Sequence, residues 1–324
     1  MTDYALSADL GGTQLRVALV DREGALHERY ATDTLAQQGR EAVVNNLVRA
    51  LGHVAGMVDR ASMVGIGVSM PGPIDPDDGT VYNPPNLPGW GIYSAKDRVE
   101  KALGMQASFA NDASLAALAE HAYGAGRGHK DMIYLTVSTG IGGGIIIDGR
   151  LYGGHKGFAG ELGHITIDRE GRLCNCGNRG CLEAQASGTA VARIANERLA
   201  SGEESVLSQH GNDDTGPVSA AQVAAAASEG DPLARSIMDE VAVNLGVGIV
   251  SYMHIFDPEI IVIGGGMSHS LDQLLPGIER EIRDHAMAHQ RERRPVVKSE
   301  LGDDVSILGA AALAFDAFDR LDQD

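Results

Sequence analysis

The three cysteines of the chain, Cys174, Cys176 and Cys181, lie within one segment of eight residues, and His164 precedes the first of them by ten positions. Three thiolates and one imidazole complete the tetrahedral shell that Zn²⁺ prefers, and they leave no position for a reactive water. Glycines inside the segment allow the tight turn that would surround a small ion. The segment therefore predicts a structural zinc site with these four ligands, which restricts how the chain can fold around it.

Two alternatives to a zinc site are three unrelated buried cysteines and one disulfide with a spare thiol. A third thiol stays unpaired in the second case, because three thiols cannot all pair within one chain. The segment from Met1 to Asp3 lacks the basic residues of a signal peptide, and no run of about 18 apolar residues predicts a membrane span. We therefore expect a cytoplasmic protein with no membrane partner. Its reducing surroundings would favour metal binding over a disulfide.

Two glutamates flank the metal segment. Glu161 precedes His164 by three positions, and Glu183 follows Cys181 by two. If one ring nitrogen of His164 binds the metal, the other becomes a fixed hydrogen-bond donor. Two carboxylates and one oriented N–H group suit a neutral polyhydroxylated ligand such as a sugar. A solvated surface charge is the ordinary alternative for each glutamate taken alone.

Composition limits the possible partners. A chain of 324 residues with 44% hydrophobic residues is typical of two domains with a cleft between them. Aromatic residues make up only 4%, and the net charge is −18, so nucleic acid and anionic membranes are disfavoured as partners. If the protein binds phosphate, backbone N–H groups and a metal ion must supply the positive charge.

Glycine-rich turns follow apolar strands at three places. The first joins expected strands over 4–9 and 15–20, and the second joins strands over 132–139 and 145–148. This internal similarity predicts a duplicated fold with two hairpins whose exposed N–H groups can approach phosphate. The third turn, Gly264 to Gly266, links a strand over 260–263 to a helix, a junction that suits adenosine or ordinary strand–helix packing.

Asn111 and Asp112 stand between a strand expected over 106–110 and a helix expected over 113–123. Asp112 alone reads as a helix N-cap, because a carboxylate there accepts free backbone N–H groups. The carboxyl ends of strands are also where open α/β sheets bind their ligands. The periodicity predicts further helices over 41–59, 94–104, 186–200, 219–228, 231–254 and 307–320.

Taken together, these motifs resemble the sugar kinases of the ROK family, and within it they are most similar to bacterial glucokinases. The matching segments span nearly the whole chain: Asp9-Leu10-Gly11-Gly12-Thr13, Asn111-Asp112, Ser138 to Gly144, Glu161-Leu162-Gly163-His164 and Cys174 to Glu183. The resemblance implies an actin/hexokinase-like (ribonuclease H-like) fold of two α/β domains. The smaller would hold residues 1–112 and about 307–324, and the larger residues 113–306 with the zinc site.

The resemblance also implies transfer of a phosphoryl group from ATP, with Mg²⁺, to the 6-hydroxyl of a hexose, most of all glucose. Asp112 would be the general base, and Asp9 would lie near Mg²⁺ through water. The sugar would be held by Asn86, Asn111, Asp112, Glu161, His164 and Glu183. The nucleotide would be held by Asp9, Gly11, Gly12, Thr13, Thr139, Gly140, Gly142, Gly143, Gly264, Gly265 and Gly266. A homodimer or homotetramer is expected.

Other functions share some of these motifs. A sugar-responsive repressor of the same family would need a helix-turn-helix domain, for which the segment before Asp9 leaves no room. A non-enzymatic sugar sensor would not need intact phosphate motifs. Within the kinases, an N-acylhexosamine kinase or a fructokinase stays open, as does polyphosphate as the donor. The segment Asn86-Leu87-Pro88-Gly89-Trp90 favours glucose.

Overall fold

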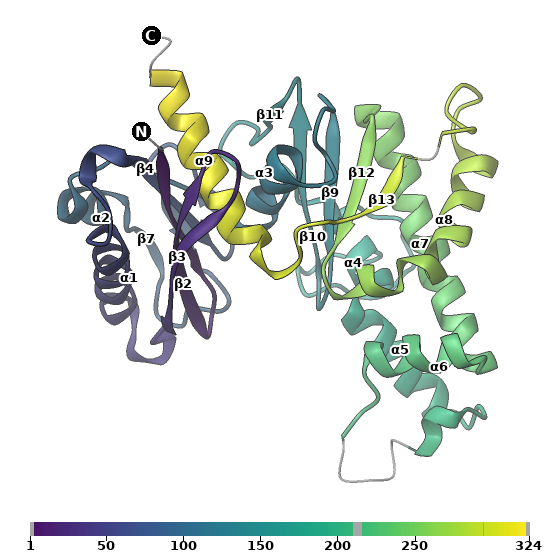
Figure 1. The fold of residues 1–324 in the computed structure, drawn as a ribbon. Helices are drawn as coiled ribbons and strands as arrows, with labels where there is room; N and C mark the ends of the chain where they lie inside the picture. The colour runs from purple at the N-terminus through teal and green to yellow at the C-terminus, as the bar shows by residue number, and fades with distance from the viewer. Residues whose placement is uncertain (1–2, 210–215, 294, 322–324) are drawn as a thin grey trace. The chain divides into compact units, whose positions relative to one another are not determined.

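The computed structural model describes residues 3–209, 216–293 and 295–321 (Figure 1). The chain forms two compact units. The first unit comprises Met1–Lys130, Gly144–Gly160 and Glu300–Asp324, and the second comprises Asp131–Gly143 and Glu161–Ser299. The division into domains that we predict at residues 112 and 306 stays a prediction.

The main sheet of the first unit has the strand order β3 (Leu26–Asp33), β2 (Gln14–Asp21), β1 (Tyr4–Leu10), β4 (Met63–Met70) and β8 (Ala107–Asn111). Strands β1, β2 and β3 pair antiparallel, and β4 and β8 run parallel to β1. The carboxyl ends of β1, β4 and β8 therefore share one edge of the sheet. The turn at Gly11 and the pair Asn111-Asp112 both lie at that edge.

Helices cover the two faces of this sheet according to the alternation of its side chains. Leu6 and Leu10 point to the face that holds α1 (Arg40–Ala55), and Ala5 points to the face that holds α9 (Val305–Leu321). Helix α9 also packs along α3 (Asp112–Tyr123). It approaches β4 so closely that a Cβ on Gly67 would lie 1.7 Å from the carbonyl oxygen of Ala310.

A small three-stranded sheet, β5 (Ile74–Asp75), β6 (Thr80–Tyr82) and β7 (Ile92–Ser94), precedes α2 (Lys96–Leu103). The sequence did not predict this sheet, because strands of two or three residues are too short to show an alternation. Its β6–β7 connection is the proline-rich loop that carries Asn86. Buried Leu87 and Trp90 anchor that loop in the core of the first unit.

The second five-stranded sheet has the order β11 (Arg150–Leu151), β10 (Ile141–Ile147), β9 (Met132–Val137), β12 (Ile260–Gly264) and β13 (Val296–Lys298), and the boundary of the two units falls within β10. Strand β12 is buried throughout and pairs parallel with β9 and β13. The two five-stranded sheets have the same strand order. In each, the first three strands lie in reverse chain order and are followed by two later strands, as the internal similarity predicts.

Helices of the second unit are α4 (Leu182–Ala186), α5 (Gly188–Ala200), α6 (Ala220–Glu229), α7 (Pro232–Phe256) and α8 (Leu271–His285), with α7 and α8 packed side by side (Figure 1). The predicted helices are confirmed within a few residues at each end. Strands β3 and β13 were not predicted. Among the described residues, no helix combines the length and the apolar character needed to cross a membrane.

Candidate functional site

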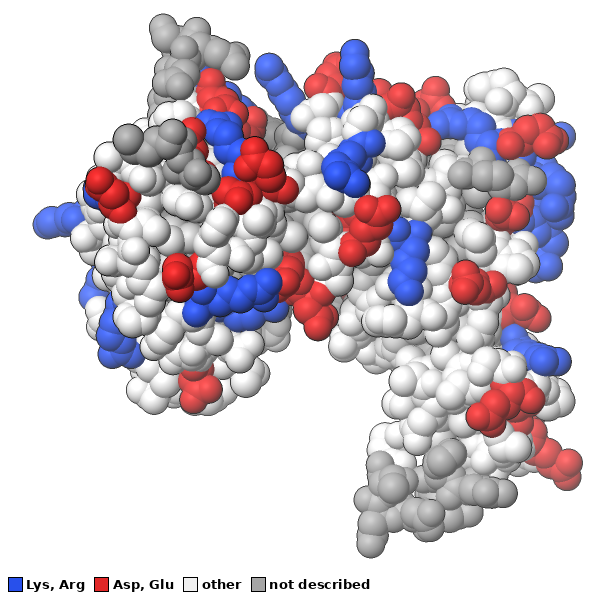
Figure 2. All heavy atoms as spheres, in the orientation of Figure 1, with Lys and Arg blue, Asp and Glu red and all other residues white. Residues whose placement is uncertain are grey.

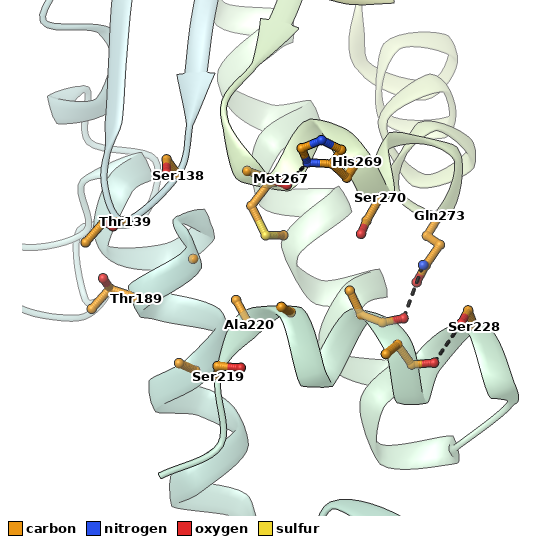
Figure 3. A pocket seen from close by; sticks show the side chains of 16 residues that line it. Ser138, Thr139, Thr189, Ser219, Ala220, Ser228, Met267, His269, Ser270 and Gln273 are labelled. Carbon is orange, nitrogen blue, oxygen red and sulfur yellow. Dashed lines mark hydrogen bonds between the residues drawn. The ribbon is translucent and has the colours of Figure 1, made fainter. Parts of the chain in front are cut away.

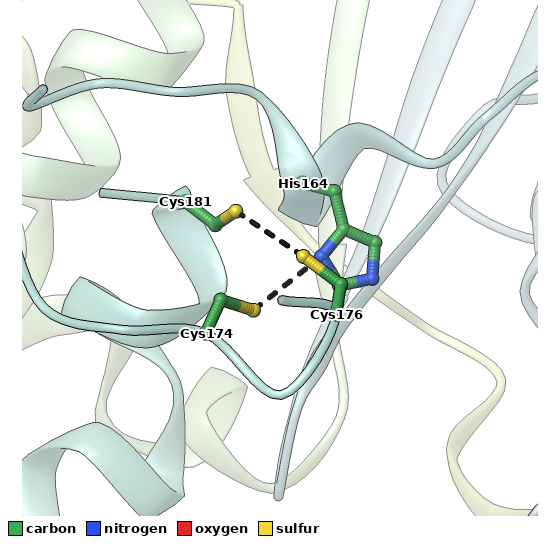
Figure 4. Close-up of side chains that lie close together, drawn as sticks. All are labelled: His164, Cys174, Cys176 and Cys181. Carbon is green, nitrogen blue, oxygen red and sulfur yellow. Dashed lines mark hydrogen bonds between the residues drawn. The ribbon is translucent and has the colours of Figure 1, made fainter. Parts of the chain in front are cut away.

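Four predicted metal ligands converge in the second unit (Figure 4). Nδ1 of His164 lies 3.7 Å from Sγ of Cys174, and Sγ of Cys176 lies 3.6 Å from Sγ of Cys181. All four ligand atoms lie within 4.8 Å of one another, and no disulfide joins the thiols. Bonds of about 2.3 Å to sulfur and about 2.0 Å to nitrogen give tetrahedral edges of about 3.5–3.8 Å. The cluster therefore has the chemistry and the size of a closed zinc shell.

The backbone around these ligands requires its glycines. Gly177 and Gly180 have φ angles of +93° and +72°. A Cβ at position 180 would lie 1.4 Å from the carbonyl oxygen of Asp168, so no side chain fits there. An isolated bridge between Thr166 and Cys181 holds the last ligand beside the segment that follows His164.

The three thiols differ in the direction in which their pKa values are shifted. Burial raises the pKa of Cys181 to about 12 and also raises the pKa of Cys174. A hydrogen bond with the backbone of Asn178 lowers the pKa of Cys176. Two buried thiols that resist ionisation would have to release their protons to bind a metal, so metal affinity must depend on pH.

The other ring nitrogen of His164 faces a predicted sugar ligand. Nε2 of His164 lies 3.9 Å from a carboxylate oxygen of Glu161. The 3₁₀ helix η3 (Leu162–His164) starts directly after Glu161 and places the two side chains on one side. Glu161 is exposed, and His164 is half-buried. A metal on Nδ1 would thus fix the direction of the Nε2–H group.

Glu183 connects the metal cluster to the second glycine-rich turn. One of its oxygens accepts the N–H of Ile141 at 2.9 Å, and the other lies 3.6 Å from Sγ of Cys174. A Cβ on Gly140 would lie 2.4 Å from this carboxylate. The predicted sugar ligand Glu183 therefore also supports the backbone of the turn, a contact that the sequence did not indicate.

That turn is braced by the start of α5. The N–H of Gly188 donates to the carbonyl of Ser138 at 2.7 Å, and the N–H of Ser138 donates to the carbonyl of Gly140 at 2.9 Å. Gly140 is the predicted phosphate-binding glycine that lies in the turn itself. Gly142 and Gly143 lie within strand β10 instead.

A pocket of about 710 Å³ opens beside this turn, entirely within the second unit (Figure 3). Its size is within the usual range for small-molecule sites. It is lined by Ser138, Thr139, Gly188, Thr189, Ala192, Ser219, Ala220, Ala221, Ala224, Ala225, Ser228, Gly266, Met267, His269, Ser270 and Gln273. No Asp, Glu, Lys or Arg is among these described lining residues. Such a neutral, largely apolar pocket suits the base and ribose of a nucleotide.

The three glycines at the end of β12, Gly264 to Gly266, have different surroundings. Gly266 lines the pocket. A Cβ on Gly264 would lie 2.2 Å from the hydroxyl of Tyr134, and Gly265, at φ +77°, would meet the carbonyl of Val137 at 2.6 Å. Gly264 and Gly265 therefore allow the chain to pass close to β9, and Gly266 is the one of the three that lines the pocket.

Sequence reasoning missed most of the pocket wall. Ala221, Ala224, Ala225 and Ser228 follow the helical spacing i, i+3, i+4 and i+7 on α6, and this stripe of small residues faces the pocket. The spacing is visible in the sequence, but an alanine stripe is also typical of close helix packing. Gln273 and His269 gave no signal that separates them from ordinary surface residues.

In the first unit, Asp9 pairs with the arginine opposite it in the β1–β2 hairpin. Nη2 and Nε of Arg16 donate to one Asp9 oxygen at 2.6 and 3.2 Å, and Nη1 donates to the carbonyl of Asp303 at 2.9 Å. The Asp9 side chain is 14% exposed. A half-buried carboxylate at the end of β1 is thus held in place by an arginine side chain.

The hairpin turn contacts the loop that carries Asn86. A Cβ on Gly12 would lie 2.9 Å from Cβ of Asn86. The carbonyl of Gly11 accepts the hydroxyl of Thr34 at 2.6 Å, and Thr13 is exposed. Predicted nucleotide and sugar residues are therefore adjacent at this edge of the first sheet.

Asn111 caps α3, and Asp112 does not. The Asn111 side chain accepts the N–H of Ser114 at 3.1 Å and lies 3.5 Å from the carbonyl of Gly72. Asp112 is the first helical residue, is exposed, and accepts the N–H of Ala113 at 2.8 Å. The alternative interpretation of Asp112 as the N-cap of α3 was wrong, because Asn111, one residue earlier, holds that position.

Surface charge is mixed. On the face drawn in Figure 2, Lys and Arg side chains of the described residues lie interspersed with Asp and Glu side chains. With a net charge of −18, this distribution gives no reason to expect a nucleic-acid partner. The absence of such a partner stays a prediction.

Comparison with known proteins shows close similarity over nearly the whole chain. The model of the ROK family matches residues 5–317. A glucokinase of Thermotoga maritima is 37% identical over 319 residues, which cover 95% of this chain and 96% of that protein.

Solved structures agree. A ROK hexokinase from Thermus thermophilus aligns with a TM-score of 0.83 at 32% identity, over 98% of this chain and 99% of that chain. A ROK family glucokinase from Streptomyces griseus, solved in complex with glucose and AMPPNP, aligns with a TM-score of 0.78 at 32% identity, over 97% and 99% of the two chains.

Proposed function

Because the chain belongs to the ROK family, we propose that it is an ATP-dependent glucokinase that phosphorylates the 6-hydroxyl of glucose. The observation that carries this proposal is the neutral pocket of about 710 Å³ beside the Thr139–Gly140 turn, which suits a nucleotide. The glucokinase of Thermotoga maritima supports it by sequence, and the Streptomyces griseus enzyme was solved with glucose and an ATP analogue.

Asp112 is the proposed general base. Transfer of a phosphoryl group needs a positioned hydroxyl and a group that takes its proton as the new bond forms. Asp112 is exposed at the start of α3, and Asn111 caps the helix in its place, so its carboxylate is not needed for capping. Asn86, Asn111, Glu161, His164 and Glu183 are proposed to hold the sugar hydroxyls.

The phosphates of ATP are assigned to the two glycine-rich turns. Gly11, Gly12 and Thr13 form one turn, and Thr139 and Gly140 form the other. Mg²⁺, when bound with ATP, neutralises phosphate charge. Asp9 fits a role beside a hydrated ion, because Arg16 binds one of its oxygens and holds the carboxylate in place at the strand end. Four other glycines are proposed to allow the backbone to follow its course beside the nucleotide without contacting the nucleotide themselves: Gly142, Gly143, Gly264 and Gly265.

The proposed ligands of Zn²⁺ are His164, Cys174, Cys176 and Cys181. The distances between ligand atoms support a closed tetrahedral shell, so the metal would stabilise the fold and orient His164.

A cytoplasmic location and a homodimer or homotetramer also belong to this proposal. Size-exclusion chromatography with light scattering would measure the oligomeric state.

A substrate panel tests the proposed activity. Purified protein would be assayed with ATP or polyphosphate as donor, crossed with glucose, mannose, fructose, N-acetylglucosamine and N-acetylmannosamine. We expect the highest kcat/KM for ATP with glucose. A higher value with fructose or an N-acetylhexosamine would identify a related kinase instead, and sugar binding without any turnover would identify a sugar sensor.

A further inference from the structure

Two side chains on one wall of the nucleotide pocket are held by backbone carbonyls. Nε2 of Gln273, on α8, donates to the carbonyl of Ala224, on α6, at 3.2 Å (Figure 3). Nδ1 of His269 lies 3.0 Å from the carbonyl of Gly266. Both residues line the pocket and stand four positions apart.

These contacts determine what each side chain can offer a ligand. A carbonyl oxygen only accepts hydrogen bonds, so the amide nitrogen of Gln273 must face Ala224, and Nδ1 of His269 must carry a proton. The atoms left for a ligand are Oε1 of Gln273 and, in the neutral imidazole, Nε2 of His269. Both are acceptors. The contact with Ala224 also opposes the rotation that would exchange the amide oxygen and nitrogen of Gln273.

The rest of the pocket provides a neutral slot for a base. Ala221, Ala224 and Ala225 of α6 and Met267 supply apolar contacts, and no charged side chain is among the described lining residues. A polar group of a base that meets no partner in such surroundings loses its hydration without compensation. The two acceptors can therefore discriminate between bases.

We propose that Gln273, assisted by His269, selects adenine by accepting a hydrogen bond from its 6-amino group. The inference rests on the proposed function, in which ATP is the donor. A purine with a 6-oxo group would direct an acceptor at Oε1 of Gln273, and two acceptors cannot bond to each other. Guanine and hypoxanthine nucleotides are then rejected by the same contact.

The test compares ATP with ITP, whose base carries a 6-oxo group in place of the 6-amino group. An unmade hydrogen bond in a partly buried site corresponds to a preference of about ten- to a hundredfold. We expect kcat/KM for ATP to exceed that for ITP by this factor in the parent protein. In Gln273→Met, which removes the acceptor at similar volume, the ratio should fall to within about threefold, chiefly through a higher KM for ATP.

Asp272→Asn is the matched control, because Asp272 is the exposed neighbour of Gln273 on α8 and does not line the pocket. It should keep the parent ratio. Equal use of ATP and ITP by the parent protein, or an unchanged ratio in a folded Gln273→Met variant, would overturn the inference.

Calorimetric binding of ADP and IDP separates this inference from the proposed function. If no sugar is phosphorylated but ADP still binds at least tenfold more tightly than IDP, the assigned activity is wrong and the role of Gln273 stands. If glucose is phosphorylated and the parent protein binds ADP and IDP equally, the activity stands and the role of Gln273 is wrong.

Discussion

Asn111 caps helix α3, and Asp112 is the proposed general base, so capping and catalysis are assigned to two adjacent residues. Asn111 accepts the N–H of Ser114 and caps α3, while the Asp112 carboxylate accepts the adjacent N–H of Ala113 and is exposed at the first helical position. Replacement of Asp112 should therefore affect chemistry more than folding. This separation makes the catalytic role of Asp112 testable with a single isosteric change.

We predict that Asp112→Asn lowers kcat by at least about 100-fold, because general-base catalysis typically contributes about 10²–10⁴-fold. The melting temperature and the affinity for glucose should change little. Steady-state kinetics and calorimetry with glucose measure the two effects. Asn111→Ala is the control and should lower stability by about 1 kcal/mol through loss of the cap. A kcat for Asp112→Asn within about tenfold of the parent would remove the catalytic role.

Asp9 gives a second prediction for a single residue. Asp9→Asn keeps a hydrogen-bond acceptor for Arg16 but removes the charge that we assign to the Mg²⁺–ATP complex. Turnover should fall strongly, whereas glucose binding should stay within about twofold, since we assign Asp9 to the nucleotide and not to the sugar. Asp33→Asn, an exposed charge change on β3, should leave both unchanged. Equal losses of glucose binding and turnover would contradict the assignment of Asp9 to the nucleotide.

The metal segment gives the first prediction for a structural element. Cys176→Ser should release bound zinc and lower the melting temperature of the second unit, because the remaining buried thiols have raised pKa values and bind metal poorly alone. Asn175→Ala, an exposed neighbour outside the cluster, should retain zinc. Metal analysis by mass spectrometry of freshly purified protein checks both variants. Absence of zinc from the parent protein would contradict the proposed shell.

Helix α7 depends on a carboxylate at its start. Asp231 accepts the N–H of Ala234 and of Val206, both at 2.9 Å. Burial raises the pKa of Asp231, but these hydrogen bonds and that of Ser205 outweigh burial and leave the pKa below its ordinary value. The carboxylate therefore stabilises the fold above the unfolded pKa of about 3.9 and loses this contribution as pH falls through the folded pKa.

We predict that Asp231→Ala lowers the free energy of unfolding by about 1–2 kcal/mol at pH 7. The difference from the parent should stay constant down to about pH 4 and shrink only below it, because the folded pKa lies under the unfolded one. Urea titrations at several pH values measure this difference. Ser219→Ala, which removes the cap of α6, should give a loss that does not vary with pH. A difference that grows as the pH falls from 7 to 5 would mean that the pKa is raised instead.

For the whole molecule, the sequence predicted the α/β class and the actin/hexokinase-like fold, which solved relatives confirm at TM-scores of 0.83 and 0.78. Hydrophobic periods and glycine turns indicated the α/β class, and the resemblance to the ROK family implied the actin/hexokinase-like fold. The convergence of His164, Cys174, Cys176 and Cys181 was also predicted from the sequence, and the structure brings their ligand atoms within 4.8 Å of one another.

Details that depend on tertiary packing could not be read from the sequence. Neither the contact of Glu183 with the N–H of Ile141 nor the packing of Gly264 against Tyr134 follows from local pattern. The short sheet β5–β6–β7 lacks enough residues for an alternation. Gln273 became a candidate only when α6 and α8 were seen to meet at one pocket.

Identification of the reaction products tests the central claim most directly. The protein would be incubated with ATP, Mg²⁺ and glucose, and the phosphorus NMR spectrum recorded over time. The account predicts that glucose 6-phosphate and ADP appear in equal amounts, and that no reaction occurs without glucose. Release of inorganic phosphate in place of a sugar phosphate, or no loss of ATP while glucose binds, would contradict it.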